Sequence, residues 1–361
     1  MAEAIIIMAG GVGSRLWPAS LAAQPKQLLR IGGGQSLIQQ AVLRAAAACP
    51  DGPIIIVTNQ QHVKPMEPHV AELASVAPGV RERVEFVAEP VGRNTAPAIA
   101  LGVTHLAERV GAEATVLVLT ADHVIDPVSA FSSDAERAAA LARTGHLVCF
   151  GIVPDRPETG YGYIHAGEPL NGGSTVHAFK EKPDAVTARG YLEAGGFYWN
   201  SGMFAFTVGS FLSELAAHAP EIAEAFSSLA TDDPAAVRAP YEGLPKISVD
   251  YALMERTSRA AVVPATFRWN DVGSWDEAAK LGQGAARAQQ DTPDHASAAP
   301  IEIEASGNYI DSDLPVAICG VSDVHVVVKN GKVLVCRRGE SQLVKQVVDL
   351  AAERGATEFL Q

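Results

Sequence analysis

The stretch AIIIMAGGVGSRLWPAS (4–20) decides the fold, because a short apolar run ends in it at three glycines within four residues. Those glycines, Gly10, Gly11 and Gly13, allow positive φ and a close approach of the backbone to a ligand. Successive backbone N–H groups in such a loop can cradle phosphate oxygens. The stretch therefore predicts a buried strand that opens onto a phosphate-binding loop. A tight surface turn with solvated charges is the alternative.

Two common phosphate loops do not fit this stretch. The dinucleotide fingerprint GxGxxG requires a third glycine where Leu16 stands, and Pro18 follows where a helix should begin. No GxxxxGK[ST] motif occurs in the sequence. What remains is a glycine loop followed by Arg15 and, in PKQ (25–27), by Lys26. Arginine can clamp a phosphate with two hydrogen bonds, whereas lysine acts as a point charge.

Four further β-branched apolar runs follow the first one, at 54–58, 84–88, 115–120 and 147–153. Alanine-rich stretches with helical spacing separate them, at 36–49, 94–110 and 128–143. Continuous apolar strands that alternate with helices predict a doubly wound α/β fold, a mainly parallel sheet covered on both faces. Ligands bind such sheets beyond the carboxyl ends of the strands. This rule selects the glycine loop, AEPVGRN (88–94) and TADHVI (120–125) for inspection.

The second half of the chain has a different pattern of predicted strands and helices. Residues 159–207 predict sheet with turns, and helices are expected at 208–226 and 248–256. The polar, turn-rich segment 281–300 is typical of a linker. Short strands follow, with a hairpin at KNGK (329–332) and an amphipathic helix near 340–354. We therefore expect a main domain over 1–285 and a small β-rich, solenoid-like domain over 286–361.

Composition narrows the classes of function. The chain has 361 residues and a net charge of −13, which argues against a nucleic-acid binder but allows local positive charge for a small anion. The four cysteines are scattered without a CxxC pair, as is usual for proteins of a reducing compartment. No apolar run reaches the length of about 18 residues that a membrane helix needs, and no signal-peptide pattern opens the chain. We expect a cytoplasmic protein that binds neither nucleic acid nor membrane.

Eight motifs together resemble the sugar-nucleotidyltransferase family, and within it the bacterial mannose-1-phosphate guanylyltransferases. They follow the family's order over residues 5–275: GGVGSRLWPAS…PKQ (10–27), EPVGRNTAPAIAL (89–101), TADHVI (120–125), GYGYI (160–164), FKEKP (179–183), WNSGMFAF (199–206), SVDYALME (248–255) and WNDVGSW (269–275). The resemblance implies a Rossmann-like nucleotidyltransferase sheet. It also implies a homodimer.

The resemblance further implies a reaction in which GTP and mannose 1-phosphate give GDP-mannose and pyrophosphate. The sugar phosphate attacks the α-phosphorus in line, and because it is already an anion no general base is needed. Such a reaction depends on alignment and on charge neutralisation. Mg²⁺ or another divalent cation would be held by Asp122 and Asp271, because magnesium prefers carboxylate and phosphate oxygens. A turn or helix-capping role is the alternative for Asp122, and an Asx turn is the alternative for Asp271.

The remaining roles are also implied by the resemblance. The catalytic residues are expected to be Arg15 and Lys26, which neutralise charge at the triphosphate, and Asp122 and Asp271, which hold the cation. The nucleotide-binding residues are expected to be Gly10, Gly11, Gly13, Ser14, Glu89, Asn94 and Thr95. The sugar-phosphate pocket is expected to comprise Gly162, Glu181, Lys182 and Asn200. Solvated turn charges and helix caps are the alternatives for several members of both sets.

Two other functions remain open at this stage. One keeps the chemistry but uses a different hexose 1-phosphate or nucleoside triphosphate. The other is a non-catalytic sensor of nucleotide sugars on the same fold, since fold alone does not establish function. The sensor hypothesis predicts loss of the charged set, yet Arg15, Lys26, Asp122, Lys182 and Asp271 are all present.

Overall fold

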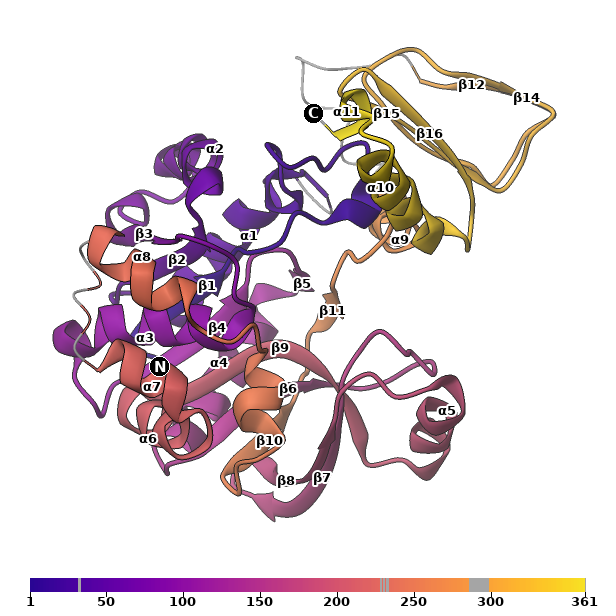
Figure 1. Cartoon of the computed structure of the whole chain (residues 1–361). Helices are drawn as coiled ribbons and strands as arrows, with labels where there is room; N and C mark the ends of the chain where they lie inside the picture. Colours follow the sequence, from indigo (N-terminus) through magenta and orange to yellow (C-terminus); the bar gives the residue numbers. More distant parts are fainter. Residues whose placement is uncertain (32–33, 228, 230, 232–233, 286–298, 361) are drawn as a thin grey trace.

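A nine-stranded sheet forms the centre of the molecule in the computed structural model (Figure 1). The structure describes residues 1–31, 34–227, 229, 231, 234–285 and 299–360. The strands run in the order β3-β2-β1-β4-β9-β6-β10-β8-β7. Their bounds are β1 (Ala4–Met8), β2 (Ile54–Asn59), β3 (Val84–Glu89), β4 (Thr115–Thr120), β6 (Leu147–Ile152), β7 (Tyr163–Leu170), β8 (Gly173–Lys180), β9 (Phe197–Thr207) and β10 (Ala260–Pro264).

The first half of the sheet is parallel and the second half is mixed. Strands β3, β2, β1 and β4 pair in parallel, with Ile5 opposite both Ile54 and Leu117. Strand β9 then pairs antiparallel with both β4 and β6. Strands β6 and β10 are parallel, and β8 and β7 complete an antiparallel edge. The prediction of a mixed, mainly parallel sheet is confirmed.

Helices cover both faces of the sheet. Ile5 and Ile7 point into a core shared with α1, α2 and α4, whereas Ala4 and Ile6 point into a core shared with α3, α6 and α7. This alternation is the period of two of a strand that is buried on both faces. The helix bounds are α1 (Leu37–Ala48), α2 (Gln60–Ala71), α3 (Thr95–Val110), α4 (Val128–Ala142), α5 (Ala185–Ala194), α6 (Val208–His218), α7 (Pro220–Phe226), α8 (Pro234–Glu242) and α9 (Trp275–Ala285).

Three sequence-based expectations differ in detail from the structure. The helix expected at 208–226 is two helices, because Pro220 begins α7 and cannot donate a backbone N–H to continue α6. The helix expected at 248–256 is a short π-helical turn over Asp250–Met254. The linker expected at 281–300 begins inside α9, and residues 286–298 of it lie outside the described residues.

The C-terminal part is built from short strands, as expected. Its strands β12 (Ile301–Ile303) and β14 (Ala317–Cys319) pair in parallel, as do β13 (Tyr309–Ser312) and β15 (Val324–Lys329). This stacking of strands, each on the next but one, is that of a β-solenoid. The predicted hairpin joins β15 to β16 (Lys332–Arg337), with positive φ at Asn330 and Gly331. Helices α10 (Val344–Glu353) and α11 (Thr357–Leu360) close the chain.

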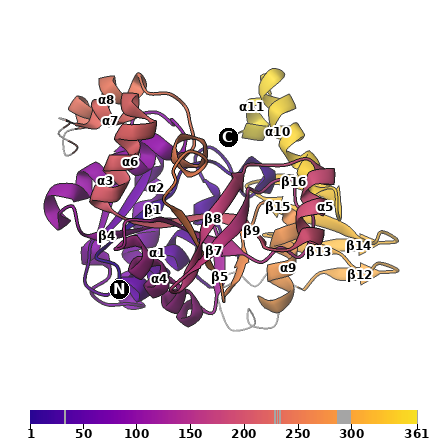
Figure 2. The ribbon, with the colours of Figure 1, turned by 90° about the horizontal axis from the view of Figure 1, so that it is seen from below.

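The C-terminal part packs beside the glycine loop and α9 (Figures 1 and 2). A third apolar cluster joins Leu16 and Trp17, which follow the glycine loop, to Trp275 of α9 and Val327 of β15. The Trp275 indole N–H donates to the Trp17 carbonyl oxygen at 2.9 Å, and the Trp17 indole N–H donates to the Phe359 carbonyl oxygen at 2.7 Å. The β-rich part is thus anchored to the segment that leads out of the glycine loop. Within the described residues, no helix is both long and apolar enough to span a bilayer.

Candidate active site

Asp122 and Asp271, 149 positions apart in the chain, are brought together by a two-stranded antiparallel pair. Strand β5 (Val124–Asp126) begins just after Asp122, and β11 (Arg268–Asn270) ends just before Asp271. Asn270 lies opposite Val124 in this pair. Asp122 follows the carboxyl end of the central strand β4. Both carboxylates therefore lie at the edge of the sheet where parallel α/β proteins bind ligands.

Lys26 connects the two aspartates. Its Nζ donates to Asp122 Oδ2 at 3.0 Å and also to the backbone carbonyl oxygen of Asp271. Burial raises the pKa of Asp122, but the Lys26 ammonium and the hydrogen bonds to the carboxylate together outweigh it, so the pKa lies below its ordinary value. Burial raises the pKa of Asp271, and Lys26 only partly offsets that rise. The lysine thus neutralises a carboxylate pair that would otherwise repel.

Hydrogen bonds from the PKQ segment (25–27) fix the conformation of the glycine loop. The backbone N–H of Lys26 donates to the Val12 carbonyl oxygen at 3.0 Å, and the Gln27 amide donates to the Gly10 and Gly11 carbonyl oxygens at 2.8 and 3.2 Å. A Cβ at Gly13, where φ is +79°, would lie 2.5 Å from the Lys26 Cβ. Glycine is therefore required at this position by both backbone conformation and space.

The glycine loop, Asp122 and Asp271 line one cavity. Its volume is about 300 Å³. Arg15 borders it, is exposed, and has no hydrogen-bond or ion-pair partner among the residues that the structure describes. The expected residues that line the cavity are Gly10, Gly11, Gly13, Ser14, Arg15, Lys26, Asp122 and Asp271. An oxyanion that enters it would meet a free guanidinium and glycine-loop amides.

His123 stiffens the end of β4 in a neutral form. Burial lowers its pKa to about 3, although Asp122 acts in the opposite direction. The Trp269 indole N–H donates to His123 Nδ1 at 3.0 Å, so the ring proton resides on Nε2. The buried Arg44 donates to the Thr120 carbonyl oxygen at 3.0 Å from the other side. These contacts give the histidine a structural role beside Asp122.

The Asp271 carboxylate is oriented by Tyr161 and by its own loop. The Tyr161 hydroxyl donates to Asp271 Oδ1 at 2.8 Å, and the Gly273 N–H donates to the same oxygen at 3.2 Å. Oδ2 accepts no hydrogen bond from the described part of the chain. A Cβ at Gly273 would lie 2.7 Å from Oδ2. Glycine at 273 therefore keeps this oxygen accessible.

The four residues expected at the sugar phosphate form a second group. A Cβ at Gly162 would lie 2.5 Å from Glu181 Oε2 and 3.5 Å from the Asn200 Cβ. The Asn200 N–H donates to the Gly162 carbonyl oxygen at 2.8 Å. Lys182 is exposed and forms an ion pair with Glu181. Chain segments after β6, after β8 and within β9 thus converge on one polar cluster.

Asp250 joins this second group, although the sequence analysis did not select it. Its Oδ1 accepts a hydrogen bond from the Asn200 amide at 2.8 Å. Burial and the neighbouring Glu181 raise the pKa of Asp250 to about 6. The available signal is the SVDYALME motif (248–255), which contains this aspartate. Tyr161 and Gln27 were missed similarly, inside GYGYI and PKQ.

Three further residues expected to bind the nucleotide, Glu89, Asn94 and Thr95, lie at the carboxyl end of β3 and the start of α3. Glu89 is buried, accepts a hydrogen bond from the Tyr241 hydroxyl of α8, and has Oε2 3.9 Å from the Cβ position of Gly10. Burial raises the pKa of Glu89. Asn94 is the N-cap of α3, and its side chain accepts from the Thr95 N–H at 2.8 Å. The helix-capping alternative for Asn94 is thus realised, and it leaves a role in nucleotide binding open.

The two aspartates fit a magnesium site that substrate completes. Magnesium in phosphoryl-transfer sites uses one or two carboxylates plus phosphate oxygens and water. The accessible Asp271 Oδ2 beside the Gly273 backbone is an oxygen of the kind that such a site requires. Among the described residues, no cluster of three or more His, Cys, Asp or Glu side chains forms a closed protein site. The remaining ligands would have to come from phosphate and water.

The comparisons with known proteins agree with this geometry. The nucleotidyl transferase family model matches residues 4–286. A MannoseP isomerase/GMP-like beta-helix domain model matches residues 299–350. Mannose-1-phosphate guanylyltransferase of Escherichia coli K12 is 40% identical over 357 residues, which cover 95% of this chain and 72% of that protein. The chain belongs to the mannose-1-phosphate guanylyltransferase family of nucleotidyl transferases.

One more relative and two solved structures are also similar to this chain. Xanthan biosynthesis protein XanB of Xanthomonas campestris is 40% identical over 370 residues, which cover 98% of this chain and 74% of that protein. The crystal structure titled mannose-1-phosphate geranyltransferase from Thermus thermophilus has a TM-score of 0.82 at 29% identity, covering 97% of this chain and 99% of the other. A UDP-glucose pyrophosphorylase bound to UDP-glucose shares the fold, with a TM-score of 0.55 at 16% identity, covering 80% of this chain and 100% of that chain.

Proposed function

We propose that this chain transfers GMP from GTP to mannose 1-phosphate, with release of pyrophosphate. The single observation that carries the proposal is the cavity in which Asp122 and Asp271 face the glycine loop, Arg15 and Lys26. Family membership and the names of the relatives support the choice of substrates. A sensor without catalytic activity would not need this complete charged set.

The proposed mechanism is an in-line displacement at the α-phosphorus of GTP. An oxygen of the sugar phosphate attacks, the bond to the β-phosphate oxygen breaks, and pyrophosphate leaves. The attacking group is an anion, so the chain needs no general base. Its task is to align two polyanions and to neutralise the charge that develops on the leaving pyrophosphate.

The glycine loop and the two cations would bind the triphosphate. We assign the amides of Gly11 and Gly13 and the Ser14 side chain to the phosphates. Arg15 is suited to the leaving pyrophosphate, because its guanidinium has no partner among the described residues. Lys26 lies in the same cavity and can turn from Asp122 to a phosphate once the carboxylates are otherwise neutralised.

Asp122 and Asp271 would hold Mg²⁺ or another divalent cation. When bound, the cation supplies positive charge between the two carboxylates and the triphosphate. Tyr161 and Gly273 keep Asp271 Oδ2 turned toward the cavity. His123 stays neutral beside Asp122 and so adds no competing charge.

The sugar phosphate would bind in the second group of residues. Lys182 provides a flexible ammonium for the phosphate, while Glu181 and Asn200 accept and donate hydrogen bonds to sugar hydroxyls. Glu89, Asn94 and Thr95 are assigned to the guanine side of the nucleotide. Another hexose 1-phosphate or nucleoside triphosphate would use the same phosphate machinery.

Three further assignments remain predictions of the same proposal. Residues 1–285 would form the catalytic domain and residues 286–361 the small β-rich domain, as the extents of the two family models support. We expect a homodimer, which sedimentation velocity can test. We also expect the protein to reside in the cytoplasm and to bind neither membrane nor nucleic acid.

The test is pyrophosphate release from the purified chain with Mg²⁺. Each nucleoside triphosphate is combined with each of several hexose 1-phosphates. The proposal expects the highest kcat/KM for GTP with mannose 1-phosphate. Release only with UTP or dTTP would overturn the choice of base, and no release with any pair would overturn the enzyme function.

A further inference from the structure

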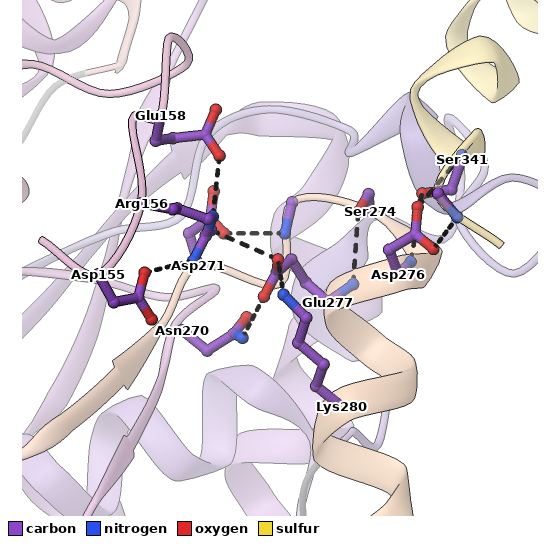
Figure 3. Close-up of polar contacts among 12 residues, drawn as sticks. Asp155, Arg156, Glu158, Asn270, Asp271, Ser274, Asp276, Glu277, Lys280 and Ser341 are labelled. Carbon is purple, nitrogen blue, oxygen red and sulfur yellow. Dashed lines mark hydrogen bonds and ion pairs between the residues drawn. The ribbon is translucent and has the colours of Figure 1, made fainter. Parts of the chain in front are cut away.

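The first turn of α9 contacts the site and the C-terminal part through adjacent residues (Figure 3). Asp276 accepts hydrogen bonds from the Ser341 hydroxyl and from the Gly339 N–H of the C-terminal part. Glu277 points the other way, toward the loops that carry Asp271 and Arg156. Its side chain is 16% exposed, and its carboxylate accepts from the side chains of Arg156, Asn270 and Lys280.

One line of contacts runs from Glu277 to Asp271 through Asn270. The Asn270 amide donates to Glu277 Oε2 at 2.7 Å, and its own oxygen accepts from the Val272 N–H at 2.7 Å. Val272 is buried and has a φ of +48°, a region that non-glycine residues rarely occupy. The Asn270 side chain therefore closes the turn in which Asp271 is the middle residue, and Glu277 holds that side chain in place.

A second line runs from Glu277 to Asp271 through Arg156 and Tyr161. The Arg156 guanidinium lies 3.5 Å from Glu277 Oε1, and its Cζ lies 5.0 Å from the ring centre of Trp199. The Tyr161 ring packs edge-on against Trp199, 5.2 Å away, and its hydroxyl donates to Asp271 Oδ1 at 2.8 Å. Arg156 thus stabilises the aromatic group that aims the tyrosine at the aspartate.

The negative charges around Arg156 favour its contact with Glu277. Burial lowers the pKa of Arg156, but Glu277 and the neighbouring carboxylates outweigh it and raise the pKa above its ordinary value. Asp155 and Glu158 also pair with Arg156, at 3.0 and 3.3 Å, but neither leads to Asp271. Within the described residues, only Glu277 contacts both Arg156 and Asn270.

The geometry points to Glu277 as the positioning residue that fixes the orientation of the Asp271 carboxylate through two converging lines of contacts. This inference rests on the proposed function, in which Asp271 holds a divalent cation. Glu277 is not a catalytic residue, because it reaches Asp271 only through Asn270 and Tyr161. Hydrogen bonds to a charged acceptor are stronger than neutral ones. Partners of a metal-binding carboxylate affect metal affinity even without touching the metal.

The variant Glu277→Gln tests this role. Glutamine keeps the size of the side chain and an acceptor for Asn270, but it removes the charge that attracts Arg156. We expect the Mg²⁺ concentration for half-maximal rate to rise roughly tenfold, within the range known for such partners. We expect kcat to fall severalfold while KM for mannose 1-phosphate stays unchanged.

A direct binding measurement provides a readout that does not depend on turnover. The electron paramagnetic resonance signal of free Mn²⁺, titrated with protein in the presence of GTP, reports the affinity of the site. Glu277→Gln is expected to weaken Mn²⁺ binding roughly tenfold. The matched control is Lys280→Ala on the next turn of α9. Its ammonium contacts Glu277 at 2.6 Å but is exposed and leads to neither line of contacts, so Mn²⁺ binding should match the wild type.

A second variant, Asn270→Ala, cuts one of the two lines and leaves Glu277 in place. It is expected to weaken Mn²⁺ binding, and the double variant should lose less than the product of the two single effects. Wild-type Mn²⁺ affinity in both folded variants would overturn the inference, and so would slower turnover with unchanged Mn²⁺ affinity. If wild-type protein binds Mn²⁺ but releases no pyrophosphate, the proposed function fails while the Mn²⁺ comparison still judges Glu277.

Discussion

Lys26 Nζ lies 3.0 Å from Asp122 Oδ2, so one cation of the site neutralises one of its two carboxylates. The lysine side chain is 8% exposed, and a Cβ at Gly13 would collide with it. The carbon stem of Lys26 is therefore packed against the glycine loop, while its ammonium reaches the two aspartates. Removing it would leave Asp122 and Asp271 facing each other without a cation.

The variant Lys26→Ala is expected to lower kcat roughly 100-fold, the scale for loss of one preorganised charge stabiliser. It should also raise the KM for GTP, because the ammonium would contact the triphosphate. Steady-state kinetics of pyrophosphate release measure both. The control Lys64→Ala removes a lysine that does not border the cavity and should leave both constants unchanged. Wild-type kcat in Lys26→Ala would refute its role at the phosphates.

The variants Asp122→Asn and Asp271→Asn are each expected to lower kcat roughly 100-fold to 1,000-fold. Each substitution keeps the size of the side chain but removes a charge that the cation requires. Their circular dichroism spectra should match the wild type, because the asparagine amide can stay in the same turns. Asp51→Asn, at an exposed position far along the chain from both, is the matched control. Turnover like the wild type in either variant would rule out that residue as a metal ligand.

The variant Gly162→Ala is expected to raise the KM for mannose 1-phosphate about tenfold or more, with a smaller effect on the KM for GTP. The added Cβ would lie 2.5 Å from Glu181 Oε2, so Glu181 must move. Gly190→Ala on α5 is the control, because a Cβ there meets nothing within 4 Å. Equal KM values for the sugar phosphate in the two variants would contradict the placement of this pocket.

Asp250 predicts a pH-dependent stability. Burial, together with Glu181, raises its pKa from 3.8 to about 6. A raised folded-state pKa means that the native state binds the proton more tightly than the unfolded state between these values. The stability supplied by the protonated group is present below pH 4 and is lost as the pH rises through 6.

The variant Asp250→Asn removes this titration while keeping an acceptor for the Asn200 amide. Its melting temperature is expected to exceed that of the wild type at pH 8 and to match it near pH 4. The gain at pH 8 should be on the order of 1–3 kcal/mol, since one pKa unit corresponds to about 1.4 kcal/mol. Differential scanning calorimetry of the variant and the wild type at the two pH values measures this difference in melting temperature. A difference between variant and wild type that does not change with pH would show that Asp250 does not titrate in this way.

Much of the fold was predictable because its signals are local. The apolar runs at β1 to β4 and the glycine loop depend on residues that are neighbours in sequence. The pairing of β5 with β11 was not predictable in this way, because each strand has three residues and they lie far apart in the chain. This pairing brings Asp122 and Asp271 together, so the resemblance to a family was needed to predict them as partners.

The residues that orient the site are even harder to predict from the sequence than the pairing of β5 with β11. Tyr161 and Glu277 act only through contacts across the fold, and nothing in their local sequence distinguishes them from packing or solvated side chains. Gln27 and Asp250 stood inside quoted motifs, but their roles depend on which backbone groups lie opposite them. For these residues the tertiary structure was required.

The most direct test of the central claim is a measurement of pyrophosphate release by the purified chain with GTP, mannose 1-phosphate and Mg²⁺. The account predicts release that requires all three components and is nearly abolished in Asp122→Asn and Asp271→Asn. Release that persists in both variants, or no release by the folded wild-type chain, would contradict it.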